Sequence, residues 1–376
     1  DLQHGGVAVQ HVGIQLVQAG DQLDWAAPEF DDSAWTVTQV PAYSPQNLRG
    51  YSGLLWYRLH LQLDLESLSL REQSGTLGIT LGKVMSAYEV YAGGEKIGAL
   101  GSLPPTPVAI YDKHQTWAIP PSAIAADGEL VLAMRVWRDP AIGEHWNTGP
   151  SSGDFLIGNI GQLREQGTRQ AFWPNLVLAA VYLAFGLYHL LIARRNPALT
   201  EFFWFGLLSL ALAAYTFETS QSKYLIDIPF HWHKKLEMLV LFLSPVFLNK
   251  TLLTATKTAD NRITHGFNLV FFLFFVAALF MSYQQVLRYA LTYFQYLGVA
   301  WSIYIAGLMS WRAVQGSRSA RGVIALLVLM VAGIINDAIL AQPLFGSGNF
   351  LYIVFALILL FIALMMAERY TEILKN

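Results

Sequence analysis

The chain of 376 residues contains no cysteine and few charged residues. Without thiols it has no disulfide, no thiolate-bound metal and no cysteine nucleophile. Asp, Glu, Lys and Arg together make up 13% of the sequence, whereas 54% is hydrophobic. A typical soluble domain has about twice that share of charge. The composition therefore indicates a membrane protein that also carries a soluble part.

The few charges are unevenly divided along the chain. Residues 1–170 hold 18 acidic and 10 basic side chains, and residues 171–376 hold 8 and 14, so the net charges are −8 and +6. We expect the two parts to lie in different solvents. The chain begins with Asp1 and not with Met, which we interpret as a mature form without its signal peptide, although an artificial start would look the same.

The second part contains seven apolar segments, each long enough for a helix to cross about 30 Å of hydrocarbon. They lie near residues 173–193, 202–219, 236–254, 264–283, 287–311, 322–342 and 349–368. With the first part placed outside, ten Lys and Arg side chains fall in the inner loops and tail and four in the outer loops. Short cytoplasmic loops collect basic residues, so this count predicts an external N-terminal domain and a cytoplasmic C-terminus.

The polar residues inside these segments exclude two classes of membrane protein. No lysine occupies the middle of a segment, so a retinal Schiff base has no amine to form on. Asp337 has no second aspartate in another segment, as an intramembrane aspartyl protease would need. Transport remains a weaker alternative. We interpret Asn336, Asp337 and His189 as candidate residues of a transmembrane relay, because intramembrane polar groups either lock helices together or move between two states.

Residues 1–165 show the alternation of β-strands. In LWYRLHLQLDL (55–65) and LVLAMRVWR (130–138) apolar residues share one face, and YEVYAGGEKIGAL (88–100) predicts a hairpin around two glycines. Short strands without helical periodicity favour a β-sandwich or jelly roll. The Asp31–Asp32 pair could bind calcium, but a turn role is favoured.

The candidate ligand site is the loop RDPAIGEHWNTGPSSGDF (138–155). It combines an aromatic platform with hydrogen-bonding groups, which suits a sugar or small polar ligand, although the tryptophan could instead plug the sandwich. Its four candidate residues are Glu144, His145, Trp146 and Asn147. A second candidate is the other face of the two strands, where a concave binding surface competes with packed ladders: Trp56, Arg58, Arg135 and Trp137.

Four segments in order resemble the galactose-binding-like jelly roll found beside sugar-processing domains: FDDSAWTVTQVP (30–41), LWYRLHLQL (55–63), YEVYAGGEKIGALGS (88–102) and GELVLAMRVWRDP (128–140). The resemblance implies an all-β jelly-roll or β-sandwich ectodomain. It implies this fold more firmly than it implies sugar binding.

The whole chain resembles the bacterial seven-transmembrane receptors with diverse intracellular signalling modules. Asn336 and Asp337 match the Asn-Asp pair of that family's sixth helix, and LYIVFALILLFIALMMAERY (351–370) resembles its seventh. The resemblance implies an all-α seven-helix transmembrane bundle in the bacterial inner membrane, which passes a periplasmic signal to a cytoplasmic output. We expect a sensor domain at 1–165, the helical domain at 166–370 and the start of an output linker at 371–376.

The prediction is therefore a receptor without an enzymatic activity, cofactor or metal in this chain. Its expected partners are a periplasmic small molecule, glycan or protein, the lipid bilayer and a cytoplasmic output domain or partner, with a homodimer possible and no nucleic acid. A non-signalling subunit of an envelope assembly, with the sandwich as a docking module, is the alternative.

Overall fold

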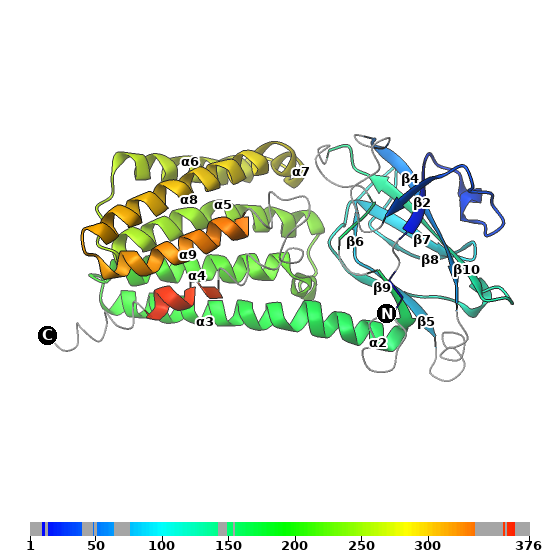
Figure 1. Cartoon of the computed structure of the whole chain (residues 1–376), viewed down its shortest axis with the longest axis horizontal. Helices are drawn as coiled ribbons and strands as arrows, with labels where there is room; N and C mark the ends of the chain where they lie inside the picture. Colours follow the sequence, from blue (N-terminus) through cyan, green and yellow to red (C-terminus); the bar gives the residue numbers. More distant parts are fainter. Residues whose placement is uncertain are drawn as a thin grey trace. The chain divides into compact units, whose positions relative to one another are not determined.

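The computed structural model describes residues 10–11, 14–39, 48, 51–63, 76–141, 149–152, 155–334, 356–357 and 359–364. The chain divides into two compact units, Asp1–Trp173 and Pro174–Asn376. The first is rich in strands and the second is helical (Figure 1). The predicted order of a β domain followed by a helical bundle is confirmed.

The strands of the first unit form two main antiparallel sheets and a small third one. The four-stranded sheet has the order β1 (Gln10–His11), β12 (Leu156–Asn159), β5 (Leu77–Leu81), β9 (Gln115–Ala118). The six-stranded sheet has the order β3 (Thr36–Gln39), β2 (Ile14–Ala19), β4 (Gly53–Gln62), β10 (Glu129–Arg138), β7 (Ala87–Ala92), β8 (Glu95–Leu100). The small sheet pairs β11 (Gly149–Ser152) with β6 (Lys83–Met85).

The main core draws on both large sheets. Strands β4 and β10 pair along their whole length, with Leu59 opposite Leu132 and Tyr57 opposite Met134. These residues share the apolar face that the alternation predicts, and Ile79 of β5 and Ile157 of β12 join the same core. Strands β4 and β10 thus contribute about one residue in two to this core.

The predicted hairpin is formed by β7 and β8. Gly93 and Gly94, which connect them, have φ angles of +55° and +82°. Two successive positive φ angles are typical of the tight turn that joins neighbouring antiparallel strands.

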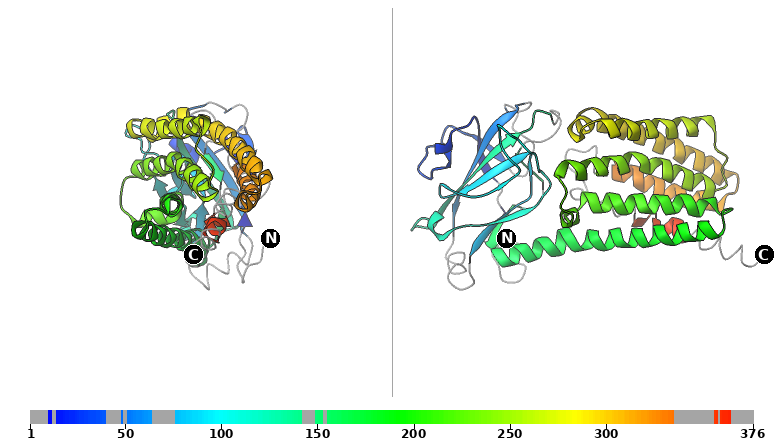
Figure 2. Two further views of the ribbon diagram at one scale, coloured as in Figure 1. Left: turned by 90° about the vertical axis from the view of Figure 1, so that its left-hand side faces the viewer. Right: turned by 180° about the vertical axis from the view of Figure 1, so that it is seen from behind.

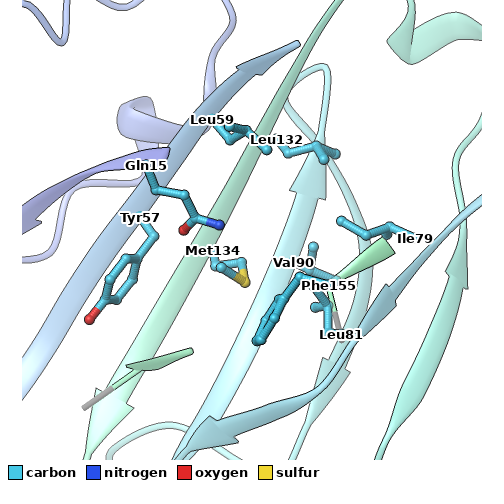
Figure 3. A pocket seen from close by; sticks show the side chains of 9 residues that line it. All are labelled: Gln15, Tyr57, Leu59, Ile79, Leu81, Val90, Leu132, Met134 and Phe155. Carbon is cyan, nitrogen blue, oxygen red and sulfur yellow. The ribbon is translucent and has the colours of Figure 1, made fainter. Parts of the chain in front are cut away.

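One enclosed space of about 10 Å³ remains in this core (Figure 3). Eight of its nine lining residues are apolar or aromatic, and the amide of Gln15 on β2 also lines it. A space of this size holds about one water molecule. This space is too small for a sugar.

The opposite face of the six-stranded sheet is covered by an aromatic layer. The 3₁₀ turn η1 (Leu23–Ala26) brings Trp25 onto Trp56 of β4, with ring centroids 6.3 Å apart and an interplanar angle of 81°. Trp35 packs edge-on against Trp25 at 5.2 Å. A second short turn, η3 (Pro121–Ala123), precedes β10.

The helical residues begin within the first unit with α2 (Ile160–Gly167) and the π-helical segment η4 (Thr168–Phe172). The second unit follows as a set of helices that run alongside one another (Figure 2). They are α3 (Trp173–Arg195), α4 (Thr200–Thr219), η5 (Gln221–Leu225), α5 (Phe230–Ala255), α6 (Arg262–Phe280), α7 (Tyr283–Gln285), the π-helical η6 (Val286–Ala290), α8 (Leu291–Val314) and α9 (Arg318–Ile334).

Within the described residues, five helical stretches are long and apolar enough to cross a membrane: Trp173–Arg195, Thr200–Thr219, Phe230–Ala255, Arg262–Phe280 and Tyr283–Val314. A shorter apolar stretch, Ala320–Gly333, falls in the sixth predicted span. Of the seventh, residues 356–357 and 359–364 are helical and the others lie outside the described residues. Helix α5 begins at Phe230, six residues before the predicted third span at 236–254, so the residues just before that span are helical.

Helices α3 and α4 approach closely at two glycines. A Cβ atom on Gly186 would lie 3.1 Å from the carbonyl oxygen of Gly206, and one on Gly206 would lie 3.1 Å from that of Gly186. Small residues at such crossings let helix backbones approach within a membrane. The pair therefore sets the spacing of these two helices.

Candidate functional site

The predicted ligand loop starts from a buried polar corner at the end of β10. Arg138 is 4% exposed, and its Nη1 donates a hydrogen bond to the carbonyl oxygen of Tyr51. The backbone N–H of Asp139 donates to Ser86 Oγ at 3.3 Å, and the Asp139 carboxylate accepts from the N–H of Ala141 at 2.8 Å. These bonds fix the direction in which the chain leaves the sheet.

The other end of the loop is held equally closely. Gly149 has a φ of +71°, and a Cβ atom there would lie 2.4 Å from the Tyr57 hydroxyl. Ser151 Oγ donates to the carbonyl oxygen of Lys83 at 3.0 Å, and Phe155 is 2% exposed. The tip between these ends (142–148), with the candidates Glu144, His145, Trp146 and Asn147, lies outside the described residues.

Trp56 and Arg58 do not lie on an open concave surface. Both side chains are fully buried under the chain that runs from η1 to Trp35. The Arg58 Nε donates to Asp32 Oδ2 at 2.6 Å, and its Nη atoms donate to four carbonyl oxygens, those of Trp25, Ala27, Pro28 and Phe30. Because the protein itself supplies these partners of the guanidinium, Arg58 is built into the structure. Trp56 and Arg58 therefore fit the predicted alternative of a packed face and not that of a concave binding surface.

Arg135 and Trp137 lie on the same face of the sheet, on the neighbouring strand β10. Arg135 bridges two carboxylates: its Nε and Nη2 are each 2.6 Å from the Asp21 carboxylate, and its Nη1 is 3.1 Å from Glu89. Trp137 is 7% exposed and packs with Ala87 and Ala109. Of the four candidate side chains on this face, only that of Arg135 is partly exposed to solvent. The other three are buried.

Asp31 takes the turn role that the sequence favours, whereas the Asp32 carboxylate contacts side chains of β4. The Asp31 carboxylate accepts from the N–H of Ser33 at 3.1 Å, as in an Asx turn. Asp32 accepts from Arg58 and lies 2.8 Å from His60 Nε2. Within the described residues no group of three or more His, Asp and Glu side chains is arranged to hold a metal.

The Asp32 contacts make the stability of the β domain sensitive to acid. Burial alone would raise the pKa of Asp32, but hydrogen bonds from His60 and Arg58 outweigh it and hold this pKa below its ordinary 3.8. A carboxyl group with a lowered pKa stabilises the fold above its unfolded pKa, and this contribution disappears as the pH falls through the folded pKa. We expect the free energy of unfolding to fall steeply below about pH 4.

Denaturation of the chain followed by tryptophan fluorescence at pH 3 to 6 measures this dependence. The Asp32→Asn variant should be less stable at pH 6 and show a flatter fall, whereas Asp24→Asn, at an exposed aspartate of the same loop, should follow the wild type. Parallel curves for wild type and Asp32→Asn would contradict the assignment.

His189, the described member of the predicted relay, is buried between α3 and α4. Its Nδ1 lies 2.7 Å from the carbonyl oxygen of Phe185 one turn earlier, and its ring is stacked near Phe202 and edge-on to Phe205, with centroids at 5.7 and 4.6 Å. The ring thus joins the two helices through aromatic packing. Asn336 and Asp337 lie outside the described residues.

The bundle also contains a group of buried charges where α4 ends and α5 begins. Its five members, called here the charged cluster, are Glu218, Lys223, His233, Lys234 and Glu237. The apolar segments expected from the sequence did not predict this cluster, because residues 220–235 fall between the second and third segments and Glu218 lies at the end of the second. The signal was present: Phe230, His233, Lys234 and Glu237 are spaced three and four apart, which places them on one side of a helix.

A family model described as 7TM diverse intracellular signalling matches residues 174–369, just over half of the chain. No curated protein matches the chain. Similar solved structures include a β-glucuronidase of Bacteroides uniformis, with 21% identity over 40% of this chain and 18% of that one at a TM-score of 0.33. Another is a β-glucuronidase of Ruminococcus gnavus in complex with D-glucuronic acid, with 13% identity, 42% and 30% coverage and a TM-score of 0.32.

The chain spans about a fifth to a third of the length of these two enzymes, and at this similarity they carry no assignment of activity. The family match agrees with apolar helices that are long enough to cross a membrane and with a β domain in front of them. The chain belongs to the 7TM diverse intracellular signalling family of membrane sensory receptors.

Proposed function

We propose that residues 1–165 are the periplasmic sensor domain of a receptor in the bacterial inner membrane, and that the loop 138–155 binds a sugar-like or small polar ligand. The observation that supports this most is the loop's construction: both ends are fixed by buried hydrogen bonds and close packing, and its tip carries Glu144, His145, Trp146 and Asn147. A loop positioned by a rigid scaffold is a common site of recognition.

The orientation in this proposal follows from the excess of Lys and Arg in one set of loops. The helices of residues 166–370 would then pass the signal to a cytoplasmic output domain or partner, beginning at 371–376. The polar residues His189, Asn336 and Asp337 are the proposed relay, because a polar contact inside a membrane can exist in two arrangements that a ligand biases.

The ligand proposal predicts a thermal shift. Ligand at a hundred times its dissociation constant should add about 2.7 kcal/mol to the stability of the β domain, or roughly 5 to 10 °C in its melting temperature. The measurement is a melting screen of the full chain in nanodiscs against neutral sugars, uronic acids and small polar metabolites. Trp146→Ala should abolish the shift.

The matched control is Trp173→Ala, which removes an exposed tryptophan at the start of α3 and should leave the shift intact. A shift that survives Trp146→Ala would place the site outside the loop. No shift with any compound would contradict small-molecule sensing and favour the alternative, in which the sandwich docks onto another envelope protein.

A further inference from the structure

The charged cluster is buried more deeply than isolated charges can be at a membrane. Lys223 and His233 are 0% exposed, Lys234 is 6% exposed, and Glu218 and Glu237 are 7% exposed. Ionised side chains buried in protein persist only with partners. The members of the cluster must therefore be paired with one another or with polar groups around them.

His233 lies between two hydrogen-bond acceptors. Its Nδ1 is 2.8 Å from Glu218 Oε2, and its Nε2 is 3.3 Å from the carbonyl oxygen of Ile226. A carbonyl oxygen only accepts, so Nε2 must carry a hydrogen. An ionised carboxylate also only accepts, whereas a neutral imidazole has a single N–H. The two contacts are satisfied together only if the pair holds one further proton, on His233 or on Glu218.

The groups around this pair come from three elements. From η5, Lys223 Nζ donates to the carbonyl oxygen of Glu218 at 3.0 Å and lies 5.3 Å from the centre of the Tyr224 ring, which in turn is 6.1 Å from the ring of His233. From α5, Lys234 Nζ donates to Glu237 Oε2 at 2.7 Å.

From α7, Tyr283 packs edge-on against Phe230 at the start of α5. Among the described residues of this stretch, Asp227 and His231 are exposed and Lys235 is half-buried.

We propose that Glu218 and His233 form a proton-binding site at the end of the bundle where α4, η5 and α5 meet, and that the bound proton fastens η5 to the two helices. When the proton leaves, either His233 and Glu218 or His233 and Ile226 face each other without a hydrogen between them. The hydrogen bond to the ionised carboxylate is the stronger of the two, so the remaining hydrogen stays on Nδ1. The contact with Ile226, which directly follows η5, is then unmade and unfavourable, so it opens and η5 is released. The site responds to acidity and does not depend on the ligand proposed for the β domain.

The test uses Glu218→Gln, because the glutamine amide can donate to Nδ1 while Nε2–H donates to Ile226. Both contacts are then satisfied without the further proton, and the packing is retained. The absence of cysteine allows one spin label to be attached at Leu225→Cys, an exposed position of η5, in the full chain in nanodiscs. Its mobility is recorded between pH 5 and 10.

In the wild-type background the mobile fraction of the label should rise at least twofold as the pH is raised, and in the Glu218→Gln background it should stay flat. His231→Gln, at the exposed histidine two residues away, should follow the wild type. Equal profiles for wild type and Glu218→Gln, or a His231→Gln profile as flat as that of Glu218→Gln, would overturn the proposal. Melting temperatures of all variants at pH 6 confirm that each is folded.

Discussion

Replacing Arg58 with methionine is expected to lower the free energy of unfolding of the β domain by about 3 to 5 kcal/mol, the range typical of breaking a buried ion pair by removing one partner. Methionine keeps much of the volume but leaves the Asp32 carboxylate without its guanidinium partner and leaves the carbonyl oxygens of the overlying chain without their donor. Trp25 and Asp32 are 7% and 9% exposed, so water can replace the lost donor only in part.

The measurement is denaturant unfolding of the full chain followed by tryptophan fluorescence, since Trp25, Trp35 and Trp56 surround the altered site. Arg135→Met is the matched control on the next strand. Its ion pair with Asp21 is partly exposed, so its loss should cost about 1 kcal/mol or less. A cost for Arg58→Met no larger than that for Arg135→Met would contradict the structural role assigned to Arg58.

The second large effect is expected in the bundle, where Gly186→Ala should destabilise the packing of α3 on α4 by about 1 to 3 kcal/mol, as overpacking does elsewhere. The added methyl group would lie 2.7 Å from Leu210 Cδ2 and 3.1 Å from the carbonyl oxygen of Gly206. The leucine can rotate, but the backbone oxygen can move only if the helices separate.

Thermal unfolding of the variant in detergent tests this, with Gly298→Ala as control, because a Cβ atom on Gly298 meets nothing within 4 Å. Alanine favours a helix by about 0.5 to 1 kcal/mol over glycine, so Gly298→Ala should be neutral or stabilising. If both variants behaved alike, the glycines of α3 and α4 would not set the spacing of these helices.

The apolar faces of the β domain could be predicted because alternation is a local property. Leu55, Tyr57 and Leu59 point to the core as their spacing requires. The opposite face could not be predicted in the same way. Polar and aromatic residues alternate identically whether a strand faces water or a covering segment, and the cover over Arg58 comes from residues about thirty positions earlier.

The charged cluster was missed for a related reason. A hydropathy profile sums over the residues of one segment. It therefore cannot relate His233 to its partner, which lies fifteen positions earlier on the preceding helix. A buried pair and two exposed charges have the same hydropathy. The spacing of Phe230, His233, Lys234 and Glu237 was the one local indication that this stretch is helical.

The hydrogen bonds of the charged cluster also bear on how the protein enters a membrane. A single charged side chain costs about 2.5 to 3.5 kcal/mol at the centre of an inserting helix and less toward its ends. Glu218 belongs to one helix and His233, Lys234 and Glu237 belong to the next, with Lys223 between them. Neither helix alone contains the full set of partners. The hydrogen bond between Glu218 and His233 can form only when both helices of the hairpin at residues 200–255 are present, so we expect the hairpin, and not the single helix, to be the unit of insertion for this part of the bundle.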